Sequence, residues 1–195
     1  MNVAWTRAAE GFPRRAFTVA DVRRMIDAGV IAEGERLELI KGELVVMAAK
    51  SVAHDNVQNA LNLVFAKVVP AGLYVGNSST LQLTEDILVE PDLAIISRDL
   101  YKRTPRGFAR PRAEDVLLVV EVAVTSLAYD RDVKSQLYAQ HGIREYWLID
   151  ANARTTWIHT GPSADGWTSI VERTPDEVLT TPALPGLAVR LNEID

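Results

Sequence analysis

The sequence predicts a mixed α/β (α+β) fold, with a central sheet flanked by helices in a single domain. Segments typical of helices and of strands follow one another along the chain, and 195 residues suffice for one domain with a sizeable core. The most apolar run, VLLVVEVAV over residues 116–124, has the length and β-branched content of a strand buried on both faces. We therefore expect this strand at the centre of the sheet.

The N-terminal part predicts a helix followed by a hairpin. Residues 17–28 have the features of a short helix, with Thr18 as N-cap, Asp21 three residues later and Gly29 as the stop. Residues 36–47 predict a hairpin with a two-residue turn at Lys41-Gly42. One face of this hairpin would be apolar, and the other would carry Glu38, Ile40, Glu43 and Val45.

The later elements follow from hydrophobic spacing and from the positions of Gly and Pro. They are a helix over 54–69, strands over 73–83 and 87–96, a polar loop over 97–114, the strand over 116–124, a helix over 130–141, a hairpin of 145–150 with 154–159, a strand over 167–172 and an irregular tail to 195. We expect one domain over residues 17–195, preceded by an N-terminal arm over residues 1–16.

Composition and charge narrow the class of protein. The net charge of −5 argues against non-specific coating of nucleic acid, because such binding depends on Lys and Arg. The chain has no cysteine, which excludes disulfides and thiolate metal sites and favours a reducing compartment. The N-terminus lacks the apolar stretch of a signal peptide, and no run approaches the roughly 18 apolar residues of a membrane span. We therefore expect a cytoplasmic protein.

Glu121 is the most informative residue, because it interrupts the apolar run of the expected central strand. An unpaired buried carboxylate costs several kcal/mol, so a compensating group must lie close to it. A bound metal ion, a basic side chain lining the core or protonation of the carboxylate itself would each serve, and the sequence alone leaves these open.

Asp92 and Lys134 extend this hypothesis to a site. Asp92 precedes the apolar residues LAII, and two carboxylates on neighbouring strands suit Mg²⁺, which takes one or two protein carboxylates and completes its shell with other oxygens. Lys134 shares a helix face with Asp130, Leu137 and Tyr138, so its ammonium is expected to lean toward the sheet. The alternatives are a Pro-Asp turn residue and a surface lysine paired with Asp130. His54 is expected at a helix start or on the surface.

The loop over residues 97–112 concentrates positive charge in an otherwise acidic protein. Such a segment can grip a phosphate backbone, and aromatic side chains can stack on unpaired bases. A solvated loop without partners is the alternative. The candidate nucleic-acid-binding residues are Arg98, Lys102, Arg103, Arg106, Arg110 and Arg112, with Tyr101 and Phe108 between them.

Four segments carry a resemblance to a known family: LELIKGEL, VEPDLAII, LLVVEVAVTS and YDRDVKSQLYAQHGIREYWLID. They resemble the Uma-type family of restriction-endonuclease-like proteins, part of the PD-(D/E)XK nuclease superfamily, over about residues 17–190. The resemblance implies a restriction-endonuclease-like fold and makes Asp92 the aspartate of the PD element. Glu121 would be the acidic residue of the second half of the motif, and Glu38 and Glu43 are candidates for a further acidic residue.

The sequence departs from the motif at Ala123, where the pattern expects a lysine. Lys134 on the following helix is expected to take its place, because the chemistry requires an ammonium at a position in space and not at a sequence offset. Asp92 and Glu121 would hold Mg²⁺ or Mn²⁺, with the backbone carbonyl of Val122 as a further ligand. The implied function is a metal-dependent endonuclease acting on DNA.

Two other readings remain open from the sequence. One is a catalytically inactive protein that keeps the nuclease fold and acts as a nucleic-acid-binding or interaction module, motivated by the net charge and by Ala123. A metal-dependent hydrolase of another phosphorylated substrate is the other. The apolar, β-rich C-terminal part also makes a homodimer an expectation.

Overall fold

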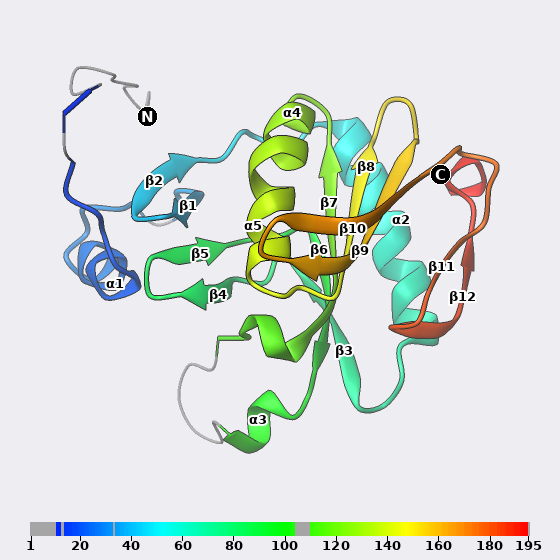
Figure 1. Ribbon diagram of the computed structural model, residues 1–195, viewed down its shortest axis with the longest axis horizontal. Coiled ribbons are helices and arrows are strands. Elements are labelled where there is room, and N and C mark those ends of the chain that lie inside the picture. Colours follow the sequence, from blue (N-terminus) through cyan, green and yellow to red (C-terminus); the bar gives the residue numbers. More distant parts are fainter. Residues whose placement is uncertain (1–10, 13, 33, 104–109, 195) are drawn as a thin grey trace. The chain divides into compact units, whose positions relative to one another are not determined.

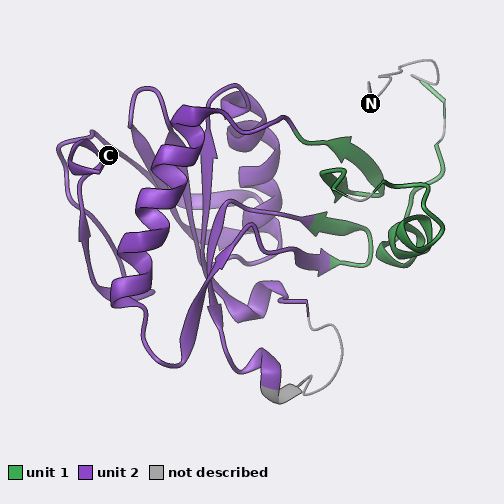
Figure 2. Ribbon diagram, turned by 180° about the vertical axis from the view of Figure 1, so that it is seen from behind, with its two compact units in different colours: residues 1–47, 84–88 green, residues 48–83, 89–195 purple. Residues whose placement is uncertain are grey.

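The computed structural model describes residues 11–12, 14–32, 34–103 and 110–194, and these form two compact units. Unit 1 contains residues up to 47 together with 84–88, and unit 2 contains residues 48–83 and 89–195 (Figure 2). A four-stranded sheet of order β2-β1-β5-β4 contains β1 (Leu37–Ile40), β2 (Glu43–Val46), β4 (Leu81–Thr84) and β5 (Ile87–Val89).

Unit 2 is built on a six-stranded mixed sheet of order β10-β9-β8-β7-β6-β3 (Figure 1). The strands are β3 (Leu73–Asn77), β6 (Leu93–Ser97), β7 (Val116–Ala123), β8 (Glu145–Asp150), β9 (Thr156–Ser163) and β10 (Gly166–Arg173). All pairs are antiparallel except β7 with β8, which is parallel. The apolar run around Glu121 is therefore an interior strand, as the sequence predicts, and the fold class is confirmed.

Helix α2 (Val52–Val68) covers one face of this sheet. Its buried residues Val57, Leu61 and Phe65 pack in one core cluster with alternate residues of the central strands. Those strand residues are Leu93, Ile95, Leu118, Val120 and Val122. Because side chains alternate along a strand, the positions between them point to the opposite face of the sheet.

The opposite face is covered by the connection from β7 to β8, as Figures 1 and 2 show from the two sides. This connection comprises α4 (Leu127–Tyr129), a π-helical turn η2 (Asp130–Lys134) and α5 (Ser135–Gln140). The helix predicted over 130–141 is therefore present but begins earlier, and its first part is wider than an ordinary α-helix. Such wide turns occur frequently at functional sites.

Unit 1 contains α1 (Val19–Asp27) and the hairpin of β1 (Leu37–Ile40) and β2 (Glu43–Val46). Thr18 caps α1, and its side chain and that of Asp21 form a reciprocal capping box. The hairpin pairs Ile40 with Glu43 around a two-residue turn, so the predicted register is confirmed. Both turn residues have positive φ, which glycine tolerates readily and which Lys41 adopts at 50°.

Two expected strands are each divided in the structure. The segment 73–83 forms β3 and β4 (Leu81–Thr84), and 87–96 forms β5 (Ile87–Val89) and most of β6. Ser78 has a φ of 48°, which turns the chain after β3. Pro91 lacks a backbone N–H for strand pairing, and it lies in the gap between β5 and β6.

The C-terminal tail is not irregular, so that expectation is wrong. It forms a hairpin of β11 (Leu179–Thr181) and β12 (Leu184–Val189), followed by a 3₁₀ turn η3 (Leu191–Glu193). Pro182 and Pro185 do not prevent this hairpin, because both strands of a two-stranded sheet are edges and tolerate a missing N–H. Its apolar residues join the core cluster beneath α2.

Two short helices lie at the ends of the polar segment between β6 and β7. They are α3 (Leu100–Arg103) and the 3₁₀ turn η1 (Ala113–Asp115). Across the described part of the chain, no helix has the length and hydropathy needed to cross a membrane.

Candidate active site

Asp92 immediately precedes β6, and Glu121 lies on the adjacent antiparallel strand β7. The register of β6 with β7 pairs Leu93 with Val120, and continuing it by one residue sets Asp92 opposite Glu121. The backbone N–H of Val122 donates to Asp92 Oδ2 over 2.9 Å, which ties the carboxylate to β7 beyond the last paired residue. Both carboxylates are buried, with only 6% of Asp92 and 4% of Glu121 exposed. Asp92 is thus a buried carboxylate bonded to β7 and not only a Pro-Asp turn residue.

Lys134 compensates Glu121 directly. Its ammonium donates to Glu121 Oε1 over 2.8 Å, and the Tyr138 hydroxyl donates to the same oxygen over 2.7 Å. Lys134 is only 3% exposed, so it is not a surface lysine. The ammonium thus reaches the strand carboxylate from the following helix, and the motif position at Ala123 is not needed for this contact.

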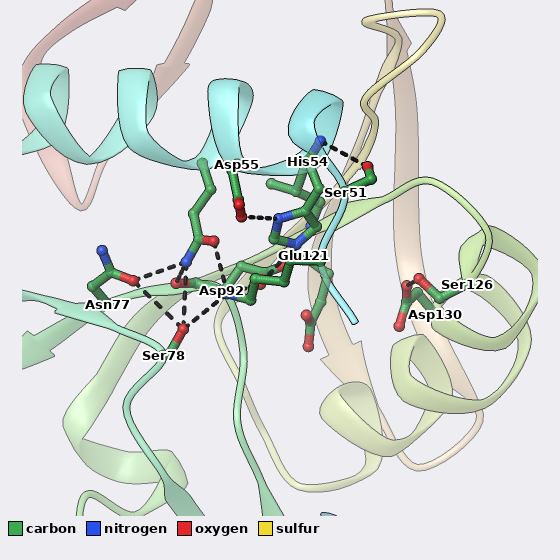
Figure 3. A network of polar contacts seen from close by, with 12 residues as sticks. Ser51, His54, Asp55, Asn77, Ser78, Asp92, Glu121, Ser126 and Asp130 are labelled. Atoms are coloured by element: carbon green, nitrogen blue, oxygen red, sulfur yellow. Dashed lines mark hydrogen bonds and ion pairs between the residues drawn. The ribbon is translucent and has the colours of Figure 1, made fainter. Parts of the chain in front are cut away.

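The π-helical turn presents a second carboxylate to the same lysine. Asp130 Oδ1 lies 4.0 Å from Lys134 Nζ, and Ser126 donates to Asp130 Oδ2 over 2.6 Å (Figure 3). The Tyr146 hydroxyl on β8 donates to the backbone carbonyl of Asp130 over 3.2 Å, so this hydrogen bond ties the turn to the sheet. These contacts fix the turn on the sheet and hold the lysine beside Glu121.

Asp92 has two basic neighbours of its own. His54 Nε2 and Lys50 Nζ each lie 3.0 Å from Asp92 Oδ1 (Figure 3 shows the histidine). His54 stands in the first turn of α2, and its other ring nitrogen faces Asp55 Oδ1 at 3.3 Å. The expected position at a helix start is confirmed, whereas a surface position is wrong, because the residue is buried with 8% exposed.

A polar network around Gln58 holds this cluster together. Lys50 donates to Gln58 Oε1 over 2.7 Å and to the Ser78 hydroxyl over 3.0 Å. The Gln58 amide donates in turn to Asn77 Oδ1 and to the backbone carbonyl of Asp92, each over 2.8 Å (Figure 3). The chain turn at Ser78 therefore brings the end of β3 to the start of β6 and to α2.

The electrostatics of Asp92 favour its charged form. Burial acts to raise the pKa of the Asp92 carboxyl, but the His54 ring, the Val122 N–H and the Lys50 ammonium outweigh it and hold this pKa below its usual value. Asp92 is therefore an ionised carboxylate at neutral pH, which is the state that a divalent cation requires.

The sequence reasoning missed Lys50, His54 and Gln58 as parts of the site. Their spacing carried a usable signal, since His54 and Gln58 are four residues apart and so share one face of α2. Val57 and Leu61 on the same helix mark the side that faces the sheet. Polar residues next to such apolar positions are expected near the sheet, and Lys50 immediately precedes the helix.

The two further acidic candidates lie in unit 1 and differ in exposure. Glu43 is exposed and pairs with Arg14 over 2.6 Å. Glu38 is buried with 2% exposed, and it interacts with other groups. The participation of either residue in the candidate site stays a prediction.

The basic segment contains an aromatic and cationic cluster at the far end of β6. The Arg98 guanidinium lies 5.6 Å from the centre of the Tyr74 ring, whose own centre is 5.9 Å from that of Tyr101. Tyr101 is 50% exposed. Arg98 and Arg112 are exposed and Arg110 is partly buried, Lys102 and Arg103 lie in α3, and Arg106 and Phe108 fall outside the described residues.

The donor set at Asp92 and Glu121 fits a hard divalent cation. Carboxylate oxygens from adjacent strands are the ligands that Mg²⁺ prefers, and Mg²⁺ needs only one or two of them. No cluster of three or more metal-ligating side chains occurs among the residues described by the structure. An ion here would therefore rely on the two carboxylates, the Val122 carbonyl, and water or phosphate oxygens.

The fold is that of a restriction-endonuclease-like α+β protein. The sequence pattern of the Uma2 family, described as putative restriction endonuclease, matches residues 19–192, and the chain belongs to this family. A solved structure with a similar fold is a putative nuclease of the DUF820 family from Anabaena variabilis, with a TM-score of 0.63 and 18% identity. The similarity covers 82% of this chain and 89% of that one. No protein of curated function matches the sequence.

Proposed function

We propose that the protein is a divalent-metal-dependent endonuclease that hydrolyses DNA phosphodiester bonds in the cytoplasm. One observation carries the proposal: the Lys134 ammonium lies 2.8 Å from Glu121, on the strand adjacent to the ionised Asp92. The Uma2 family membership and the fold shared with a putative nuclease support the same activity.

The residues take distinct roles in this proposal. Asp92, Glu121 and the Val122 carbonyl would hold Mg²⁺ or Mn²⁺, which when bound lowers the pKa of a water ligand and stabilises charge on the phosphate. Lys134 would orient the attacking hydroxide and offset the negative charge that develops on the phosphate. Tyr138 holds the Glu121 carboxylate through its hydroxyl, so that the lysine and the carboxylate keep a fixed relative position.

The DNA contact is proposed along β6. Val75 packs in the α2 core, so Tyr74 points to the opposite face of the sheet, the face on which Glu121 lies. Ile96 pairs with Tyr74 and lies four residues from Asp92, about 13 Å along a strand. A DNA strand on this face would span both places, with Arg98 against a phosphate and Tyr101 against an unpaired base.

Cleavage of supercoiled plasmid tests the enzyme. The wild-type protein is expected to nick or linearise DNA with Mg²⁺ or Mn²⁺ and not with EDTA, and Asp92→Asn and Glu121→Gln are expected to remove the activity. Asp165→Asn, which changes an exposed aspartate between β9 and β10, is the matched control and is expected to cleave normally. Comparison with RNA and nucleotide substrates tests the choice of DNA.

A second candidate is a nucleic-acid-binding protein that keeps the fold without cleaving. It is favoured by the pairing of both carboxylates with basic residues, Asp92 with Lys50 and Glu121 with Lys134. DNA binding of equal strength with Mg²⁺ and with EDTA, without cleavage, would support this candidate over the enzyme.

A homodimer is proposed with the enzyme, because two active sites suit the cutting of both strands. Ile170 on the outer strand β10 of the six-stranded sheet is 56% exposed, which is the kind of surface a second copy can cover. Light scattering of the purified protein measures its mass, and a monomer at all concentrations would overturn this part.

A further inference from the structure

We propose that Lys50 is a substrate-binding residue that rests on Asp92 until a divalent ion displaces it, and that its released ammonium then contacts a phosphate of the DNA. This inference rests on the proposed function. It assigns a role to a lysine that lies outside the motif and that the reaction scheme above does not use.

The Lys50 ammonium contacts the Asp92 oxygen that is not bonded to the backbone of β7. It lies 3.0 Å from Asp92 Oδ1, whereas Asp92 Oδ2 already accepts from the Val122 N–H. A Mg²⁺ ion binds a carboxylate oxygen at about 2.1 Å. An ion on Oδ1 and the Lys50 ammonium would therefore be like charges within a few ångströms of each other, in a buried place where solvent screens little.

Lys50 is the neighbour that can move. Its side chain is 21% exposed, while that of His54 is only 10% exposed and is held on its other side by Asp55. A lysine ammonium sits on four flexible carbons and can rotate to a new acceptor while its backbone stays in place. His54, as part of α2, is fixed by the helix that carries it.

A nearby phosphate would be a suitable new partner for the displaced ammonium. In its resting position Lys50 makes three polar contacts, with Asp92, Gln58 and Ser78. Loss of the Asp92 contact leaves a positive charge at the start of α2 with only neutral partners. A phosphate that joins the ion at Asp92 brings negative charge to this place, and lysine binds phosphate as a point charge.

Lys50→Met tests the displacement through metal affinity. Without the competing ammonium, Mn²⁺ measured by calorimetry is expected to bind about tenfold more tightly than to the wild type, the scale of one hydrogen bond to a charged group. A lysine that only positions Asp92 predicts the opposite, weaker binding. Equal or weaker Mn²⁺ binding by the variant overturns the proposal.

DNA binding tests the second half of the proposal. With Ca²⁺ in place of Mg²⁺, so that binding is measured without cleavage, Lys50→Met is expected to bind duplex DNA about tenfold more weakly than the wild type. In EDTA the two proteins are expected to bind alike, because Lys50 then rests on Asp92. Unchanged affinity in Ca²⁺ overturns the phosphate contact.

Two further variants keep the result interpretable. Lys50→Gln removes the charge and retains hydrogen-bonding capacity toward Ser78, so it replaces Lys50→Met if that variant unfolds. Lys67→Met removes an exposed lysine from the last turn of the same helix and is expected to leave Mn²⁺ affinity unchanged. Failure of the wild type itself to bind Mn²⁺ would refute the proposed function, whereas normal wild-type binding with no gain in Lys50→Met would refute only the role of Lys50.

Discussion

Lys134 donates to Glu121 over 2.8 Å although the two residues are thirteen positions apart and belong to different elements. The glutamate projects from the interior strand β7, and the lysine comes from the π-helical turn that follows it. A lysine two residues after Glu121 would point to the same face, since strand side chains repeat with a period of two. In the motif, a lysine at position 123 would supply the ammonium beside this carboxylate. Here the π-helical turn supplies it instead.

Lys134→Met is expected to reduce the rate of DNA cleavage by about 10²–10³-fold, the scale for removal of one group that stabilises developing charge. The variant also leaves the Glu121 carboxylate buried without its cation, which is expected to lower the free energy of unfolding by about 3–5 kcal/mol. Cleavage kinetics and urea unfolding of the same preparations measure the two effects.

The double variant Glu121→Gln with Lys134→Met separates stability from activity. Removal of both charges is expected to recover part of the lost stability and none of the cleavage. Full cleavage by Lys134→Met, with the fold intact, would contradict the assigned role of the lysine.

Tyr138→Phe is expected to destabilise the protein by about 1.5–3 kcal/mol, because it removes a buried hydrogen bond to the Glu121 carboxylate. The phenyl ring keeps its packing against Tyr146, whose ring centre is 5.2 Å away. Cleavage is expected to fall less than in Lys134→Met, since the hydroxyl is assigned only the orientation of Glu121. A larger fall in cleavage than that of the lysine variant would show that Tyr138 takes part in the chemistry.

Glu145, which lies outside the candidate site, leads us to expect that the free energy of unfolding depends on pH. Burial raises the pKa of the Glu145 carboxyl above its usual 4.5, against the opposing hydrogen bonds from Thr181 and Trp147. A raised folded-state pKa means that this contribution to stability is fully present below pH 4.5 and is lost as the pH rises through the folded-state value.

Glu145→Gln removes this titration. Its free energy of unfolding, relative to that of the wild type, is therefore expected to rise between pH 4.5 and neutral pH and to level off above the folded-state pKa. Urea unfolding of both proteins across pH 4–8 measures the difference, in which the other titrating groups cancel. A difference that stays constant across this range would contradict the raised pKa.

The cluster at Tyr101 predicts a preference for unpaired DNA. Tyr101→Ala is expected to weaken binding to single-stranded DNA by about 1–3 kcal/mol and to affect duplex binding less, because a base must be free to stack. Arg98→Ala is expected to weaken binding to single-stranded and to duplex DNA. It is also expected to reduce the slope of the logarithm of the binding constant against the logarithm of the salt concentration by about one. Fluorescence anisotropy in EDTA measures all four affinities, and equal losses on both DNA forms in Tyr101→Ala would contradict stacking.

Local patterns predicted the elements wherever spacing and capping agreed. The capping box at Thr18, the two-residue turn at Lys41 and the interior strand around Glu121 were all predictable, because each depends on residues close in sequence. The division of 73–83 and the C-terminal hairpin were not predictable. They depend on the left-handed backbone at Ser78 and on tertiary packing beneath α2.

Of the candidate site, the sequence predicted only the two carboxylates, Asp92 and Glu121, and the lysine of the following helix, Lys134. A carboxylate within an apolar strand signals a compensating group, and this argument led to Glu121 and Lys134. Lys50 and His54 reach Asp92 from 38 to 42 positions earlier in the chain, through a helix packed on the sheet. The helical spacing places His54 on the sheet-facing side of α2, but no local pattern identifies Asp92 as its partner, so the contacts of Lys50 and His54 with Asp92 required the structure.

Location of the bound ion tests the central claim most directly. Crystals grown with Mn²⁺ and measured at its absorption edge are expected to show one anomalous peak between the carboxylates of Asp92 and Glu121, within about 2.2 Å of an oxygen of each. The peak is expected to disappear in Asp92→Asn. No peak at saturating Mn²⁺ would contradict a metal-dependent nuclease site. A peak elsewhere, with Glu121 still hydrogen-bonded to Lys134, would contradict it as well.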